Sequence, residues 1–210
     1  MECYPVIMFE QELFEMYKNI TYINRNKVIE REQDFFQEVI DNPQKKYLNL
    51  GCGERILPGF INVDKYYQDS QVINFDIFQL PFEDNSIDGI FCAHVLEHLP
   101  FRHARLAIIE WARVLKGFLY LGIPDVELIF EYFKVNDDID MFLVTLFGFQ
   151  TDPGNRGEDL NYPVNDGHFH KCGFTKKMIQ DQLEVNGFVI DELYNYDGWG
   201  TPSIWVKAHI

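Results

Sequence analysis

The stretch YLNLGCGERILPGFINVD, residues 47–64, constrains the fold of this chain more than any other segment. The apolar run YLNL ends in Gly51-Cys52-Gly53, and a second strand-like run, FINV, follows and ends in Asp64. Glycines at the carboxyl end of a strand let a ligand approach the backbone closely. An acid that closes the next strand can accept hydrogen bonds from ribose hydroxyls. The segment therefore predicts two successive strands and a site for a nucleoside-containing cofactor at their ends.

The rest of the chain alternates between strand-like and helix-like segments. This alternation predicts an α/β fold with a mainly parallel sheet and helices on its faces. The predicted strands are 46–51, 60–64, 71–76, 87–93, 117–123, 188–195 and 203–209. The predicted helices are 102–116, with Leu106, Ile109 and Val114 on its apolar face, then 125–133, 138–147, and a helix capped by Thr175 that runs to about Asn186.

The length of 210 residues fits one compact domain. We assign this domain to residues 46–210 and a helical extension to residues 1–45, where apolar positions at helical spacing predict helices over 9–20 and 27–40. Residues 150–167 are rich in glycine, proline, asparagine and aspartate. A loop of that length in a compact domain is usually functional, so we expect it to act as a lid.

Composition narrows the range of partners. The formal net charge of −15 at pH 7 disfavours nucleic-acid binding, because phosphate contacts need a basic face. The 4 cysteines form no CxxC pair, which indicates a reducing compartment. No apolar run reaches membrane-spanning length, and the start of the chain is not a secretory signal. We expect a cytoplasmic protein with a small-molecule or sugar substrate and without a nucleic-acid or membrane partner; the sequence does not predict its oligomeric state.

The motifs together resemble those of the class I S-adenosylmethionine (SAM) dependent methyltransferases, especially bacterial and phage predicted methyltransferases with an LNLGCG start. The segments that carry the resemblance are LNLGCG, PGFINVD, LPF…SIDGI…HVLEHL and HFHKCGF. The resemblance implies a Rossmann-like methyltransferase fold, with a mainly parallel seven-stranded sheet, an antiparallel last strand and helices on both faces. It also implies SAM as the cofactor and methyl transfer as the activity, whereas the expected small-molecule or sugar acceptor rests on the net charge.

The resemblance also assigns roles to residues that follow the strands. Asp64 would accept the ribose hydroxyls, Asp76 would accept the exocyclic amine of adenine, and Cys52 would be a small filler between the glycines rather than a nucleophile. His94 and Val95 would run beside the methionyl group. The full set of cofactor-binding residues that it implies is Asn49, Gly51, Cys52, Gly53, Asp64, Asp76, Ile77, His94 and Val95.

Several positions depart from the common pattern. Asn49 stands where the motif has an acid, and its amide can accept a hydrogen bond from the SAM ammonium without charge assistance. Arg55 replaces the third motif glycine, and the link ERILPGF is too short for the usual crossover helix. These departures leave open an alternative function, a non-catalytic SAM-binding regulator or partner subunit. Ile56 stands where a dinucleotide fingerprint needs its last glycine, which disfavours a nicotinamide enzyme.

The segment HFHKCGF, residues 168–174, holds the candidate residues for chemistry on the acceptor. His168 and His170 share a face if the segment is extended. The pKa of histidine lies near working pH, so we expect one of the two to act as the general base for an acceptor hydroxyl. The pair and Cys172 could also bind zinc, but no second cluster supplies further ligands, and we predict no metal. The pair could instead simply fix the loop onto the domain.

Overall fold

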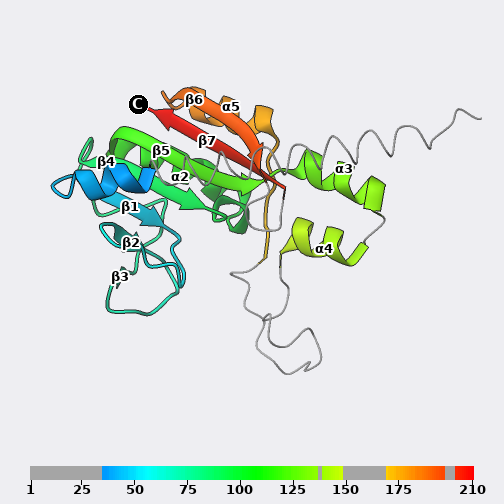
Figure 1. Cartoon of the computed structure of the whole chain (residues 1–210), viewed down its shortest axis with the longest axis horizontal. Helices are drawn as coiled ribbons and strands as arrows, with labels where there is room; N and C mark the ends of the chain where they lie inside the picture. The colour runs from blue at the N-terminus through cyan, green and yellow to red at the C-terminus, as the bar shows by residue number, and fades with distance from the viewer. Residues whose placement is uncertain (1–34, 137–138, 149–168, 197–201) are drawn as a thin grey trace, which may run out of the picture.

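The computed structural model describes residues 35–136, 139–148, 169–196 and 202–210 of the chain (Figure 1). Its centre is a 7-stranded sheet with the strand order β3-β2-β1-β4-β5-β7-β6. The strands are β1 (Tyr47–Leu50), β2 (Ile61–Val63), β3 (Val72–Ile73), β4 (Ile87–Ala93), β5 (Leu115–Pro124), β6 (Val189–Tyr196) and β7 (Ser203–His209). All seven coincide with predicted strands, although β3 is shorter than expected.

The direction of the strands confirms the predicted sheet. Each neighbouring pair from β3 to β5 is parallel, whereas β7 lies antiparallel to both β5 and β6. The chain builds outward from β1 to β3 and then returns to β4 on the other side of β1. The strand order therefore reverses between β1 and β4, which is the point where doubly wound sheets bind ligands beyond their carboxyl ends.

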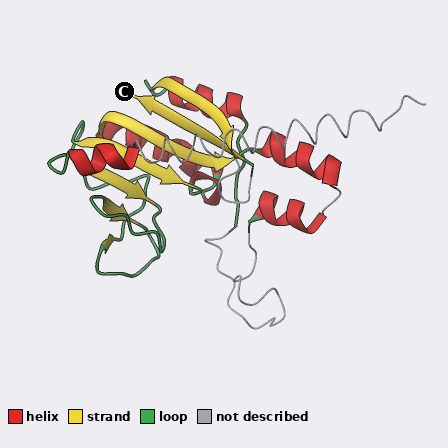
Figure 2. Cartoon of the chain, in the orientation of Figure 1, coloured by secondary structure: helices red, strands yellow, loops and turns green. Residues whose placement is uncertain are grey.

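Helices lie on both faces of the sheet (Figure 2). The helical elements are η1 (Leu96–His98), α2 (Phe101–Val114), α3 (Val126–Asn136), α4 (Ile139–Phe147) and α5 (Lys176–Glu184). Helices α2 and α5 share one hydrophobic core with β1, β4, β5 and β7. On the opposite face, Phe35 and Val39 of a helical segment over 35–41 pack with Phe91, Tyr120 and Trp205. Figure 1 shows α3 and α4 at the end of the sheet toward which β5 points.

The buried face of α2 differs from the prediction. Ala104, Ala107, Ile108, Trp111 and Val114 face the core, while Leu106 and Ile109 are 40% and 50% exposed. The spacing of the buried set follows the turns of one helix face, and the fully buried Trp111 anchors it by donating from Nε1 to the carbonyl of Ile77 at 2.9 Å. The sequence-based prediction assigned the large apolar side chains of α2 to the buried face. In the structure the buried face includes small alanines, which allow the helix to approach the sheet.

The structure also tests the predictions for a helix cap and for the link between β1 and β2. The Thr175 hydroxyl accepts a hydrogen bond from the Met178 amide at 3.2 Å, which confirms it as the N-cap of α5. No helix separates β1 from β2, as the short link predicted. The helix expected over 9–20 and the loop 150–167 lie outside the described residues. None of the described helices is long and apolar enough to cross a membrane.

Candidate functional site

The turn Gly51-Cys52-Gly53 after β1, called the glycine turn below, packs against a neighbouring residue at Gly51 and leaves open space at Gly53. Gly51 and Gly53 have φ angles of +63° and +49°, which side chains rarely adopt. A Cβ on Gly51 would lie 2.4 Å from Cγ2 of Val95, so the turn after β1 contacts the residue that follows β4 closely. A Cβ on Gly53 would meet no atom of the described residues within 4 Å. The turn thus leaves open space beside Gly53, where a ligand can reach the backbone.

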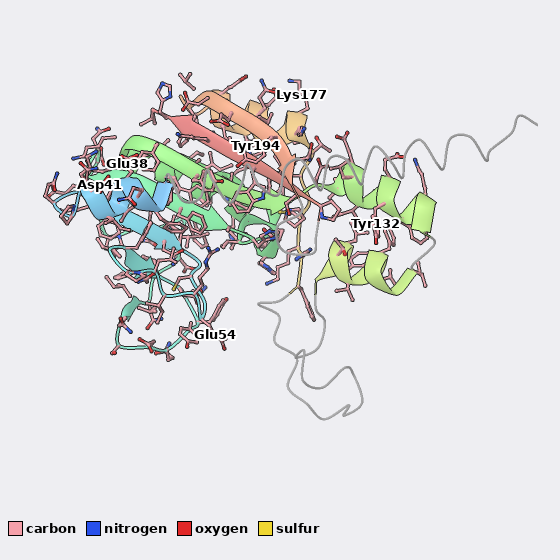
Figure 3. All side chains as sticks on the ribbon, in the orientation of Figure 1. Glu38, Asp41, Glu54, Tyr132, Lys177 and Tyr194 are labelled. Atoms are coloured by element: carbon pink, nitrogen blue, oxygen red, sulfur yellow. The ribbon has the colours of Figure 1, made fainter. Side chains whose placement is uncertain are left out.

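Asp64, directly after β2, ties this turn to the next loop. Its Oδ2 accepts a hydrogen bond from the Gly53 amide at 2.9 Å, and its Oδ1 accepts from the amides of Tyr66 and Tyr67 at 2.8 and 2.9 Å. A carboxylate has about four acceptor sites, so Oδ2 keeps the capacity for a ribose hydroxyl. Glu54, labelled in Figure 3, marks the outer side of the same turn.

The sequence predicts that Asp76 ends the third strand, but β3 ends at Ile73, so Asp76 and Ile77 lie in the loop that follows it. Lys65 Nζ lies 3.0 Å from Oδ1 of Asp76, and this contact raises the pKa of the lysine. The carbonyl of Ile77 is occupied by Trp111. Asp76 thus meets a cation from the loop after β2, which sequence reasoning missed because no motif marks Lys65.

Asn49 holds the short β1–β2 link in place. The residue is 3% exposed, and its Nδ2 donates to the Arg55 carbonyl and to Oδ1 of Asn62, both at 2.8 Å. The guanidinium of Arg55 lies 5.2 Å from the ring centre of Phe91, on the aromatic face of the sheet. Hydrogen bonds from the buried Asn49 side chain thus hold this link in place, where parallel strands usually have a crossover helix. Both of these bonds use Nδ2, so Oδ1 of Asn49 can accept a hydrogen bond from a ligand.

The cysteine of the turn has the character of a filler. Burial, together with the neighbouring Asp64 carboxylate, raises the pKa of Cys52 to about 11. A neutral thiol is a poor nucleophile. The geometry is therefore consistent with the packing role expected for this residue.

The residue after β4, His94, adopts a left-handed backbone conformation with φ of +56°, which is uncommon outside glycine. Its ring lies between two polar groups. Nδ1 is 3.3 Å from Oε1 of Glu97, and Nε2 is 3.4 Å from the hydroxyl of Ser203 at the start of β7. His94 thus connects the carboxyl end of β4 with the last strand of the sheet.

The segment that begins at Phe169 lies against η1. The amides of Lys171 and Cys172 donate to the Glu97 carbonyl at 2.6 and 3.2 Å, and the Cys172 thiol donates to the Leu96 carbonyl at 3.3 Å. Nδ1 of His98 lies 3.3 Å from the carbonyl of Phe169. These contacts bring His170 beside His98, with ring centres 4.9 Å apart.

The Glu97 side chain is only 1% exposed and lies among three histidines. Burial by itself raises the pKa of this carboxyl, but the close approach of the His94 ring and the charges of His94, His98 and His170 outweigh it and lower the pKa. Burial also lowers the pKa of His170, mainly because the charged imidazolium is poorly solvated there. At neutral pH the cluster therefore combines a carboxylate with a neutral imidazole of His170.

The structure places one predicted base in a larger cluster than expected. His168 lies outside the described residues, whereas His170 meets Glu97 and His98. Sequence reasoning missed Glu97, and it gave His98 no role in a site. The signal was the acid flanked by histidines in HVLEH, but its burial depends on a segment more than seventy residues away.

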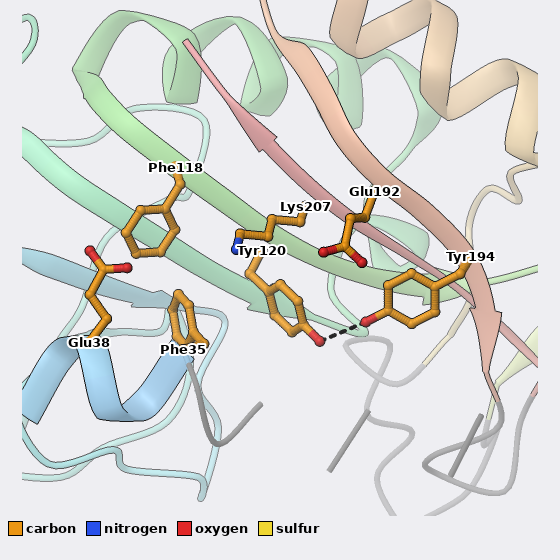
Figure 4. A pocket seen from close by; sticks show the side chains of 7 residues that line it. All are labelled: Phe35, Glu38, Phe118, Tyr120, Glu192, Tyr194 and Lys207. Carbon is orange, nitrogen blue, oxygen red and sulfur yellow. Dashed lines mark hydrogen bonds between the residues drawn. The ribbon is translucent and has the colours of Figure 1, made fainter. Parts of the chain in front are cut away.

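A hollow of about 200 Å³ lies elsewhere, on the sheet face that carries the helical segment 35–41 (Figure 4). Phe35, Phe118 and Lys207 are among its lining residues, and the hydroxyls of Tyr120 and Tyr194 meet in it at 2.8 Å. The hollow opens along the middle of β5 and β6 rather than at the strand ends. It is therefore separate from the site built by the glycine turn, Asp64 and His94.

Solved structures with the same fold span nearly the whole chain. Magnesium protoporphyrin IX methyltransferase from Synechocystis, solved with bound S-adenosylhomocysteine (SAH), superposes with a TM-score of 0.54 at 16% identity, covering 96% of this chain and 95% of that one. A SAM-dependent methyltransferase from Methanosarcina mazei gives 0.56 at 17% identity, covering 78% and 91%. One from Clostridium acetobutylicum gives 0.52 at 16% identity, covering 95% and 98%. No curated protein matches the sequence.

The strand order, the antiparallel β7 and the ligand-accessible edge at β1 and β4 define the class I SAM-dependent methyltransferase fold. Residues 48–120, which contain the glycine turn, Asp64, Asp76 and His94, match the family model described as a methyltransferase domain. The chain therefore has the fold of the class I SAM-dependent methyltransferases, with a segment that matches a methyltransferase domain.

Proposed function

We propose that the protein transfers a methyl group from SAM to a hydroxyl of a small molecule or sugar. The observation that carries this proposal is the arrangement of the carboxyl ends of the strands. The open glycine turn and Asp64 meet there on one side of the reversal in strand order, and the histidine cluster follows β4 on the other. The net charge of −15 favours a neutral or cationic acceptor over a nucleic acid.

The residues at this edge fit SAM. Open space beside Gly53 admits the ligand to the backbone, and Oδ2 of Asp64 accepts a ribose hydroxyl. The side chain of Asp76 is 31% exposed and accepts a hydrogen bond from the adenine amine. Lys65, which pairs with Asp76, shifts to make room for this bond. Oδ1 of Asn49 faces the ammonium, and His94 and Val95 line the methionyl part. When bound, SAM supplies an electrophilic methyl group on a sulfonium that is a good leaving group.

The acceptor hydroxyl lies on the β4 side of this edge, beside His170. An O–CH₃ bond forms as the S–CH₃ bond breaks, the sulfur keeps the electron pair, and the hydroxyl proton must be removed. His170 promotes the loss of this proton, and its low pKa suits that role because the ring is neutral at working pH. The proposed lid over residues 150–167, which leads directly into His168, remains part of this proposal.

Binding of SAH to the purified protein tests the cofactor assignment. A ligand that binds only the native state must raise the melting temperature, so we expect a thermal shift and measurable heat in calorimetry. No heat and no shift at millimolar SAH would refute the cofactor. Release of SAH from SAM in the presence of hydroxyl-bearing acceptors then separates the enzyme from a SAM-binding regulator, which would bind SAH without turnover.

We expect His170→Ala to leave the affinity for SAH nearly unchanged and to lower turnover by about a hundred-fold, the usual contribution of a group that assists proton transfer. His209→Ala is the matched control, because His209 also pairs with a carboxylate, Asp191, but lies on an exposed part of the sheet. If His170→Ala lowers activity only in proportion to a loss of folded protein, the residue merely holds its segment in place.

A further inference from the structure

Three side chains next to the proposed acceptor site converge on one point. Glu97, His98 and His170 each direct a ligand-type atom to a space in which these atoms lie within 4.8 Å of one another. The three residues come from η1 and from the segment after the lid, so the chain brings them together only by folding. This group of Glu97, His98 and His170 is called the 97–170 cluster below.

The carboxylate of Glu97 is the first argument for a ligand. Both of its oxygens are fully buried, and neither has an aligned hydrogen-bond donor among the described residues. His94 Nδ1 lies 3.3 Å from Oε1, within reach for charge attraction but without hydrogen-bond alignment. A buried carboxylate without aligned donors is costly unless a cation compensates it.

The orientation of His98 is the second argument. Its Nδ1 lies 3.3 Å from the Phe169 carbonyl, which can only accept, so Nδ1 carries the proton. Nε2 is then a lone-pair donor, and it faces Oε1 of Glu97 at 4.0 Å. Two acceptors that face each other at this distance cannot hydrogen bond, but a cation can bridge them. A histidine whose other nitrogen is held by a backbone carbonyl is the usual arrangement of a metal ligand.

His170 is the third residue of the 97–170 cluster, and like His98 it has one ring nitrogen engaged by the backbone. A hydrogen bond to the Thr145 backbone engages its ring, and an imidazole has a second nitrogen to offer. Ligand atoms at about 2.1 Å from a tetrahedral zinc ion lie roughly 3.4 Å apart. The distance between Nε2 of His98 and Oε1 of Glu97 is 4.0 Å, and all the ligand atoms of the cluster lie within 4.8 Å of one another. The side chains must therefore move closer together when a cation binds.

We propose that the 97–170 cluster binds a divalent transition-metal cation through two imidazoles and one carboxylate. Three protein ligands leave coordination positions open for an exogenous oxygen, as in catalytic zinc sites. Nitrogen ligands disfavour Mg²⁺ and Ca²⁺, which prefer oxygen. The role of the cation rests on the proposed function: it binds the acceptor hydroxyl and lowers its pKa, so that the proton leaves to water before the methyl group is transferred. His170 then promotes the loss of the proton by holding the cation and does not take the proton itself.

Titration of metal-stripped protein with Co²⁺ tests this inference directly. We expect one equivalent to bind, with visible absorption bands from nitrogen and oxygen ligands, competition by Zn²⁺ and none by Mg²⁺. His98→Ala and His170→Ala should each weaken binding at least about ten-fold. His209→Ala should not, because His209 and Asp191 form a histidine–carboxylate pair at 3.0 Å that belongs to no such cluster.

Two results would overturn the inference. One is the absence of Co²⁺ and Zn²⁺ binding to the folded wild-type protein at millimolar cation, which needs no variant. The other is unchanged binding in a folded His98→Ala or His170→Ala protein, which would place the cation elsewhere. SAH titrations of the same samples keep the proposals apart: SAH binding without metal binding refutes only the metal site, and metal binding without SAH binding refutes only the cofactor assignment.

Discussion

Gly51→Ala is expected to destabilise the protein by about 2–4 kcal/mol and to abolish measurable SAH binding. The left-handed backbone costs roughly 1 kcal/mol for any residue with a Cβ. The new methyl would also lie 2.4 Å from Cγ2 of Val95, and overpacking of this kind costs about 1–3 kcal/mol. Relief of the clash moves the turn after β1 away from the end of β4, where the ligand is proposed to bind.

Gly53→Ala is the matched control for this prediction. Gly53 shares the positive φ, but its Cβ would meet no neighbour among the described residues within 4 Å, so only the backbone cost of about 1 kcal/mol applies. Adding Val95→Ala to Gly51→Ala should recover much of the lost stability, because the two changes act on one contact. Chemical denaturation of all four proteins measures these differences. Equal losses in Gly51→Ala and Gly53→Ala would show that Val95 does not close the turn.

Asp64→Ala is expected to lower the affinity for SAH about ten- to a hundred-fold and to reduce stability by about 1–3 kcal/mol. Losing a hydrogen bond to a charged acceptor costs roughly 1.5–3 kcal/mol, which is the expected loss at the ribose. The motif alone predicts little loss of stability. The structure changes this expectation, because the carboxylate also accepts from the amides of Gly53, Tyr66 and Tyr67.

Asp69→Ala provides the control for Asp64. Asp69 lies exposed in the same loop, and its Oδ1 accepts from one amide only, that of Gln71 at 2.8 Å. Calorimetry with SAH and denaturant unfolding should show a clear loss for Asp64→Ala and a small one for Asp69→Ala. An unchanged dissociation constant in Asp64→Ala would mean that the ribose is bound by other residues.

The sequence sufficed for the sheet and for placing Gly51, Asp64 and His94 at the ends of its strands. Strands and helices have distinct periodicities, and the ends of parallel strands lie at one edge, so Gly51, Asp64 and His94 could be placed together from their order alone. The hydrogen bonds that hold this edge together could not be predicted. The groups that donate to the Asp64 carboxylate are backbone amides, and no pattern of side chains in the sequence marks them.

The histidine cluster shows where sequence reasoning stops. The motif HFHKCGF drew attention to its own cysteine and histidines, but the fold pairs His170 with Glu97 and His98, and Cys172 remains a thiol that donates to the Leu96 carbonyl. Burial raises the pKa of Cys172 to about 12, so the group stays a neutral thiol at working pH. Such a pairing across two segments depends on tertiary packing, which a single sequence does not record.

The antiparallel β7 has a consequence for how the protein is made. Strand β7 inserts between β5 and β6, and Ser203 at its start reaches His94 over a separation of 109 residues. During synthesis, β1 to β6 emerge from the ribosome before β7, so β5 and β6 must remain apart with open edges until the last strand arrives. Open edges favour pairing with other chains. Translational pausing before residue 203, or binding of a chaperone to this intermediate, should therefore have a large effect on the yield of folded protein.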